Sequence, residues 1–170
     1  MKTKKLAIGS MLVAMCLIGA NIKLMGSIAF DSAPAFVGAL LLGPVYGMAL
    51  GFFGHLLSAI ISGFPLSVPV HLITAVMMAV TMLAYSAIRR LLHNRANKYI
   101  TVLVAGGTAY LLNCPLALLA LYPLLDDMVF VLFPVLTVGS IVNIAAAELV
   151  YAALPAGWKA RFTNALRTSE

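Results

Sequence analysis

Residues 34–62 read PAFVGALLLGPVYGMALGFFGHLLSAIIS, and the Gly-Pro pair at positions 43 and 44 decides how many helices the chain forms. Residues 34–43 alone would make a helix of about 15 Å, half the depth of a hydrocarbon core about 30 Å thick. Either residues 34–62 form one kinked span, or the pair is a tight turn between two helices. Because proline cannot continue a helix and glycine relieves the backbone, the pair favours the turn.

The distribution of charge distinguishes the same two alternatives, which correspond to five and six helices. With five helices, the basic loop at 89–98 and the basic C-terminal tail fall on opposite sides of the membrane, against the cytoplasmic bias of Lys and Arg. With six helices and the N-terminus inside, every Lys and Arg except Lys23 is cytoplasmic. We therefore predict six transmembrane helices with both termini cytoplasmic, at about 5–25, 34–43, 46–62, 69–91, 99–121 and 128–154.

Composition indicates an all-α integral membrane protein that forms a single transmembrane domain, residues 1–170. Hydrophobic residues make up 63% of the chain and charged residues 9%, and the mean hydropathy is +1.06, far above an ordinary soluble domain. The 11 Lys and Arg, against 5 Asp and Glu, gather in short connections, so they indicate topology rather than nucleic-acid binding. The N-terminal segment imitates a secretory signal, but it lacks an A-x-A cleavage site and is predicted as the first helix.

Polar residues inside the apolar spans point to a binding site near the outer side. An ionisable or amide side chain in a bilayer is costly and usually faces the bundle interior or a cavity. The predicted spans place Asn21, His55, His71 and Asn113, from four helices, at one depth beneath the outer loops. Asn143, on the polar face of the last helix, joins these candidates. The alternative for each is an interhelical hydrogen bond that only packs the helices.

Three further residues in the spans have structural explanations. Glu148 lies deeper, toward the cytoplasmic end of the last helix, where it either lines a cavity or pairs with a basic residue such as Arg89. We favour the pairing. Cys16 and Cys114 fall in apolar runs without Cys-x-x-Cys or Cys/His ligand spacing, so we expect small buried side chains rather than a disulfide or a metal site.

Motifs for energy use and catalysis are missing from the sequence. It contains no GxxxxGK[ST] phosphate loop, no HExxH and no GxSxG, and we expect no cofactor and no metal. An intramembrane enzyme that uses His55, His71 and Glu148 stays as an alternative, because imidazole and carboxylate can shuttle protons. A binding unit for a small molecule, driven by a partner, fits better. The small residues of Ser10-x-x-x-Ala14 offer a docking face for that partner, with packing inside the bundle as the alternative.

The pattern D-x-x-P-A-x-x-x-A-x-x-x-G-P-x-x-G at residues 31–47 resembles that of the S components, the substrate-binding subunits of energy-coupling factor (ECF) vitamin transporters. The resemblance covers nearly the whole chain, and the family's Ala-x-x-x-Ala docking motif appears as Ser10-x-x-x-Ala14. It implies a six-helix bundle in the bacterial cell membrane that binds a vitamin beneath two outer loops, those between helices one and two and between helices three and four. It also implies a transmembrane coupling subunit (T component) and two cytosolic ATPases as partners. Asp31, which opens the pattern, is included among the candidate substrate-binding residues.

The substrate is suggested by the segment GHLLSAIISGFPLSVPVHL, residues 54–72, which looks most like S components for α-ribazole, a benzimidazole nucleoside precursor of cobalamin. Amide and imidazole groups suit ribose hydroxyls and ring nitrogens. Riboflavin, pantothenate or another vitamin stays open as the alternative. Aromatic residues near the outer loops would cover the base, namely Phe30, Phe36, Phe64 and Tyr122.

Overall fold

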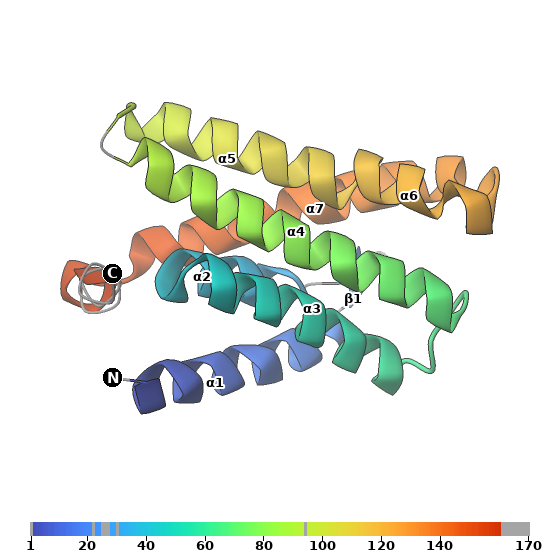
Figure 1. Ribbon diagram of the computed structural model, residues 1–170, viewed down its shortest axis with the longest axis horizontal. Helices are drawn as coiled ribbons and strands as arrows, with labels where there is room; N and C mark the ends of the chain where they lie inside the picture. Colours follow the sequence, from blue (N-terminus) through green and yellow to red (C-terminus); the bar gives the residue numbers. More distant parts are fainter. Residues whose placement is uncertain (1, 22, 25–27, 30, 94, 161–170) are drawn as a thin grey trace.

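The computed structural model describes residues 2–21, 23–24, 28–29, 31–93 and 95–160, and in these residues the chain is almost entirely helical. Figure 1 shows the helices lying lengthwise along one bundle. The elements in chain order are α1 (Lys2–Asn21), β1 (Lys23–Leu24), β2 (Ile28–Ala29), α2 (Ala33–Leu42), α3 (Pro44–Ile61), α4 (Val68–Leu92), α5 (Lys98–Asn113), α6 (Pro115–Leu125) and α7 (Met128–Ala153).

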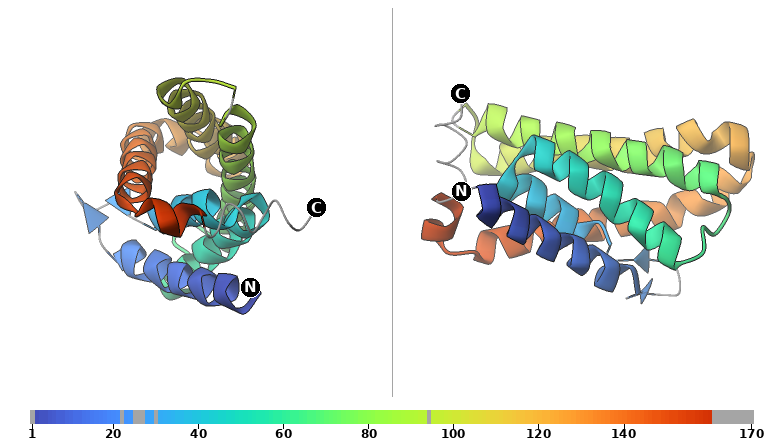
Figure 2. Two further views of the ribbon diagram at one scale, coloured as in Figure 1. Left: turned by 90° about the vertical axis from the view of Figure 1, so that its left-hand side faces the viewer. Right: turned by 60° about the horizontal axis from the view of Figure 1, so that its bottom comes forward.

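The bundle has two distinct ends. The start of α1 and the end of α7 lie at one end, and the α3–α4 loop and the turn between α6 and α7 lie at the other (Figure 1). We call these the inner end and the outer end, since the predicted topology places them at the cytoplasmic and external faces. Seen end on, α1 and α5 lie on opposite sides of the bundle, with α2 and α3 between them (Figure 2).

The short helix α2 is the centre of the packing. It contacts α1, α3, α4 and α7, and eight of its ten residues are buried, as expected for a helix that is apolar all round. Small residues let α3 pack closely against α2. A Cβ added to Gly47 of α3 would lie only 2.5 Å from the Cβ of Ala39 on α2. Phe36 meets the ring of Tyr85 on α4 edge to face, with centroids 5.1 Å apart. The Ser86 hydroxyl donates to the Ala39 carbonyl over 2.6 Å.

The Gly-Pro pair forms the predicted turn. Helix α2 ends at Leu42 and α3 begins at Pro44, so residues 34–62 form two helices rather than one kinked span. Gly43 between them has a φ of 100°, in the region that favours glycine. A side chain there would also collide with the guanidinium group of Arg90 at the end of α4. The turn is therefore fixed both by its own backbone and by α4.

Replacing Gly43 by alanine should lower the free energy of unfolding by about 2 kcal/mol, because a Cβ is strained at this φ and displaces Arg90. Thermal unfolding in detergent measures the change. Gly107→Ala on α5 is the matched control, since a Cβ there meets open space, and it should keep or raise the Tm. Equal Tm values for Gly43→Ala and the parent protein would contradict this explanation.

Within the residues that the structure describes, four helical segments are long and apolar enough to cross a membrane. They are Pro44–Ile61, Val68–Leu92, Lys98–Leu125, which combines α5 and α6, and Met128–Ala153. Two further apolar helices, Lys5–Ala20 and Ala33–Leu42, are shorter. The protein is thus an all-helical membrane protein with several candidate spans, and the count of six spans with cytoplasmic termini stays a prediction.

Two predicted helix boundaries are wrong. The predicted helix at 99–121 is two helices, because Cys114 between α5 and α6 has φ −122° and ψ −78°. Pro115 explains the break: it has no N–H, and its ring disfavours the helical conformation in the preceding residue. The first helix ends at Asn21 rather than near residue 25, since residues 23–24 pair antiparallel with residues 28–29, which satisfies their backbone groups across strands.

Candidate functional site

His55 on α3 and His71 on α4 are in direct contact at the outer end. Nε2 of His55 lies 3.1 Å from Nδ1 of His71, and Nε2 of His71 lies 2.6 Å from the carbonyl oxygen of Pro65 in the loop between the helices. Close packing permits this contact, because a Cβ on Gly51 of α3 would lie 2.9 Å from the carbonyl oxygen of Met78 on α4. The two histidines thus make an interhelical hydrogen bond, and their contact with substrate stays a prediction.

Asn113 and Asn143 meet around one turn of α7. Asn113 Nδ2 donates to the hydroxyl of Ser140 over 2.8 Å. Asn143 Oδ1 accepts from the N–H of Ala33, the first residue of α2, over 2.9 Å, and its Nδ2 donates to the Gly139 carbonyl over 2.9 Å. Ser140 and Asn143 are three residues apart and share a helical face. We call Asn113, Ser140 and Asn143 the α7 polar group; it joins α2, α5 and α7.

Asp31 lies just before α2, two residues from the backbone contact of Asn143. Burial raises the pKa of the Asp31 carboxyl above its usual range, and hydrogen bonds from the backbone N–H groups of Asp31 and Ser32 only partly offset this effect. A carboxyl biased toward its neutral form can donate as well as accept a hydrogen bond. Asn21 is the last residue of α1, but its side chain lies outside the described part of the structure.

Glu148 pairs with Arg89, which confirms the structural pairing favoured from the sequence. Arg89 Nη2 lies 3.2 Å from Glu148 Oε2, and the Tyr85 hydroxyl donates to Oε1 over 2.5 Å. The Tyr151 ring faces both the Arg89 guanidinium, at 5.8 Å, and the Lys159 ammonium, at 4.9 Å. We call these five residues the inner cluster; its ion pair fastens α4 to α7.

The inner cluster separates Glu148 from the histidines. Tyr85, which bonds to Glu148, is 14 positions from His71 along α4, or about 21 Å of helix. A single intramembrane catalytic site made of His55, His71 and Glu148 is therefore wrong. In the described residues, no group of three or more His, Cys, Asp or Glu is placed to hold a metal ion.

Ser58 on α3 has a buried hydroxyl without a partner. The residue is 6% exposed, and within the described part of the chain its Oγ has no hydrogen bond. It follows Gly54 by one turn, and a Cβ on Gly54 would lie 3.3 Å from Sγ of Cys16 on α1, so Ser58 lies on the face of α3 toward α1. Buried polar atoms are nearly always bonded, which makes this hydroxyl a candidate ligand contact. The sequence places Ser58 near the outer side but favours a packing role for it, because serine commonly packs membrane helices, so it is not among the predicted site residues.

The aromatic candidates have different roles in the structure. Phe36 is fully buried against Tyr85 in the core, so its predicted place over the base is wrong. Phe64 lies in the α3–α4 loop, with its ring centroid 5.8 Å from that of His71. Tyr122 on α6 is exposed. Phe30 lies outside the described residues. Phe64 and Tyr122 therefore remain as candidates to cover an aromatic ring.

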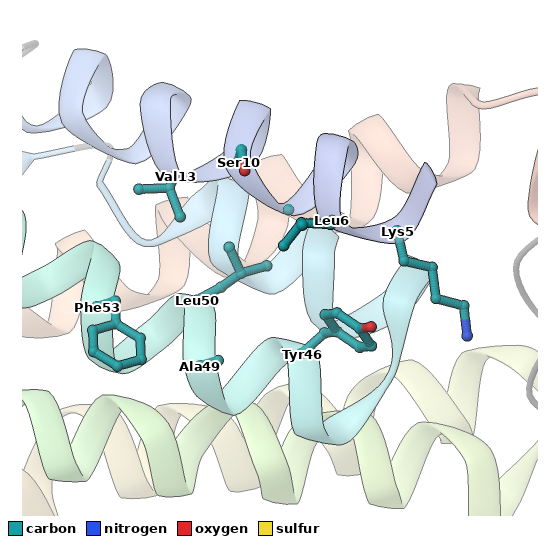
Figure 3. A pocket seen from close by; sticks show the side chains of 9 residues that line it. Lys5, Leu6, Ser10, Val13, Tyr46, Ala49, Leu50 and Phe53 are labelled. Carbon is teal, nitrogen blue, oxygen red and sulfur yellow. The ribbon is translucent and has the colours of Figure 1, made fainter. Parts of the chain in front are cut away.

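The predicted docking face on α1 lies on the outside of the bundle. Ser10 and Ala14 are both exposed, and a Cβ on Gly9 would meet open space, so the alternative that this face packs inside the bundle is wrong. Beside it, α1 and α3 enclose a shallow, mainly apolar groove of about 240 Å³ (Figure 3). The groove is lined from α1 by Lys5, Leu6, Gly9, Ser10 and Val13, and from α3 by Tyr46, Ala49, Leu50 and Phe53.

Comparison with known proteins gives one match. A family model described as "ECF transporter, substrate-specific component" matches residues 4–155. Searches among curated proteins and among solved structures gave no significant match. The family match runs from the first turn of α1 to just beyond the end of α7. This chain belongs to the family of ECF transporter substrate-specific components.

Proposed function

We propose that the protein captures α-ribazole at the outer end of the bundle for ATP-driven import across the cell membrane. Members of the ECF substrate-specific family are substrate-binding subunits that work with a coupling subunit and ATPase subunits, and they are not enzymes. The identity of the substrate is the further step proposed here. The buried and unpaired hydroxyl of Ser58 carries the proposal of a ligand site, because a bound polar molecule would supply its missing partner.

The chemistry of the candidate site suits an uncharged nucleoside. His55, His71, Asn113 and Asn143 offer imidazole and amide groups, and the Asp31 carboxyl, whose pKa is raised by burial, adds further hydrogen-bonding oxygens. Ribose hydroxyls and the imidazole nitrogens of a benzimidazole use groups of this kind, and Phe64 and Tyr122 can pack on its ring. Riboflavin offers similar contacts. Pantothenate is less suited, because none of these candidate groups is a cation that would pair with its carboxylate. The amide of Asn21 is proposed as a further contact.

The identity of the substrate is tested by purifying the protein from cells fed α-ribazole, riboflavin and pantothenate together. Mass and ultraviolet spectra of the extracted ligand separate a benzimidazole, a flavin and a non-absorbing vitamin. We expect the benzimidazole nucleoside at close to one per protein. Recovery of a flavin or of pantothenate would identify that vitamin as the substrate instead of α-ribazole. Recovery of none of the three would overturn the proposal that the protein binds a vitamin of this group.

Ser58→Ala should weaken binding of the co-purified ligand about fivefold, since one hydrogen bond contributes about 1 kcal/mol. It should not lower the Tm of the ligand-free protein, because it removes a buried hydroxyl that has no partner within the described residues. Ser86→Ala is the matched control: its hydroxyl bonds to Ala39, so this change should lower the Tm and leave the affinity unchanged. Calorimetry and thermal unfolding measure the two effects, and a reversed pattern would exclude Ser58 as a ligand contact.

A further inference from the structure

The groove between α1 and α3 opens on the outside of the bundle, where a membrane protein meets lipid. Leu6 on its α1 side is 66% exposed and Phe53 on its α3 side is 57% exposed, whereas Leu50 between the two helices is buried. A small residue keeps the space open, because a Cβ on Gly9 would meet nothing within 4 Å. In a bilayer an acyl chain fills such a hollow, since an empty space forfeits van der Waals contacts along its lining.

The groove extends through most of one leaflet of the membrane. It runs along α1 from Lys5 to Val13, eight positions or about 12 Å of helix. Half of a hydrocarbon core about 30 Å thick is about 15 Å. Lys5 and Tyr46 lie at one end of the groove, and Val13 and Phe53 lie at the other (Figure 3). Since α1 starts at the inner end of the bundle, the groove begins near the predicted cytoplasmic face and reaches toward the middle of the membrane.

The inner end of the groove carries a positive charge. The ammonium nitrogen of Lys5 lies 5.9 Å from the ring centroid of Tyr46, which holds the lysine toward α3. Helices α1, α2 and α3 contain no Asp or Glu, and Glu148 of α7 is paired with Arg89. These three helices therefore supply no carboxylate for Lys5. A lipid phosphate at the cytoplasmic surface has the complementary charge.

We propose that this groove binds one anionic phospholipid of the cytoplasmic leaflet, with an acyl chain between α1 and α3 and the headgroup phosphate on Lys5. The inference does not depend on the proposed substrate, which is assigned to the outer end of the bundle. Ser10 belongs both to the groove and to the predicted docking face, so the lipid is assigned to the subunit without its partners. A docked partner helix is the alternative occupant.

Headgroup preference tests the role of Lys5. The full-length subunit, without its partners, is placed in nanodiscs of equal parts anionic phosphatidylglycerol and zwitterionic phosphatidylcholine, and native mass spectrometry identifies the lipid that it retains. We expect one lipid, with phosphatidylglycerol retained about fivefold more often than phosphatidylcholine. Lys5→Gln should bring the two lipids close to parity, and Lys5→Arg should keep the preference. Lys98→Gln is the matched control, since it removes an exposed lysine outside the groove, and it should also keep the preference.

Gly9→Leu tests the apolar part of the site. Its side chain enters the groove without a clash at the Cβ, so retention of both lipids should fall at least about fivefold. The Tm of this variant in detergent should be kept or raised, because leucine is a better helix former than glycine. Gly107→Leu on α5 is the matched control. A Cβ there also meets open space but lies outside the groove, so lipid retention should not change.

Three results with the variants would overturn the proposal: a preference for phosphatidylglycerol that survives Lys5→Gln, an equal loss of preference in Lys98→Gln, or full lipid retention in Gly9→Leu. Retention of no lipid by the parent subunit would also overturn it and would leave the groove to the partner helix. Since every measurement is made without substrate, these outcomes are independent of whether α-ribazole is the ligand.

Discussion

Replacing Glu148 by alanine is expected to lower the free energy of unfolding by about 3 kcal/mol, since removing one member of a largely buried ion pair leaves the other charge uncompensated. The side chains of Arg89 and Glu148 are only 13% and 17% exposed, so water compensates little for the lost partner. For a chain of this length the change corresponds to a Tm lower by roughly 6–12 °C. Thermal unfolding in detergent measures it.

Two further variants distinguish the effect of an unpaired charge from the effect of losing the other contacts of Glu148. Tyr85→Phe removes only one hydrogen bond to Glu148 and should cost about 1 kcal/mol. The joint change of Arg89→Met and Glu148→Leu replaces the pair by apolar side chains and should recover most of the stability lost in Glu148→Ala. A joint variant that is less stable than Glu148→Ala would show that the inner cluster acts through something other than an unpaired charge.

The turn at Gly43 and the pairing of Arg89 with Glu148 were accessible from the sequence because each rests on a strong local or electrostatic constraint. A ten-residue apolar segment followed by Gly-Pro cannot span a bilayer as a straight helix, and a lone carboxylate in a span needs a cation. These two features depend on residue type and spacing alone. The sequence also placed His55 and His71 at one depth beneath the outer loops, but their hydrogen bond to each other was not predicted and appears only in the structure.

Other features depend on tertiary context that a single sequence does not carry. Pro115 ends a helix, whereas Pro123 and Pro134 lie inside α6 and α7, so proline alone does not locate the break. Asn143 satisfies the first N–H of α2, a contact between residues 110 positions apart. The unpaired hydroxyl of Ser58 is recognised only once its surroundings are known, because a serine in an apolar helix usually finds a backbone or side-chain partner.

Replacing Ser10 and Ala14 together by leucine should reduce uptake by the assembled transporter at least about tenfold, while retention of substrate by the isolated protein stays the same. Both residues are exposed on α1 beside the apolar groove, where small side chains let a partner helix approach closely. Two leucines would hold that helix away, and a loss of only about 1.4 kcal/mol in association weakens it tenfold. Uptake into cells and co-purification of the coupling subunit measure the effect.

The matched control is Ala145→Leu on α7, an exposed position outside the groove, which should leave uptake and co-purification unchanged. If uptake falls equally in this control, then a larger side chain at any exposed position of the bundle reduces uptake, and the effect is not specific to the α1 face. If the double variant loses uptake but still co-purifies with the coupling subunit, α1 acts after docking instead. Only combined loss of uptake and partner, with substrate still bound, agrees with small residues on α1 serving as the docking face of this substrate-specific component.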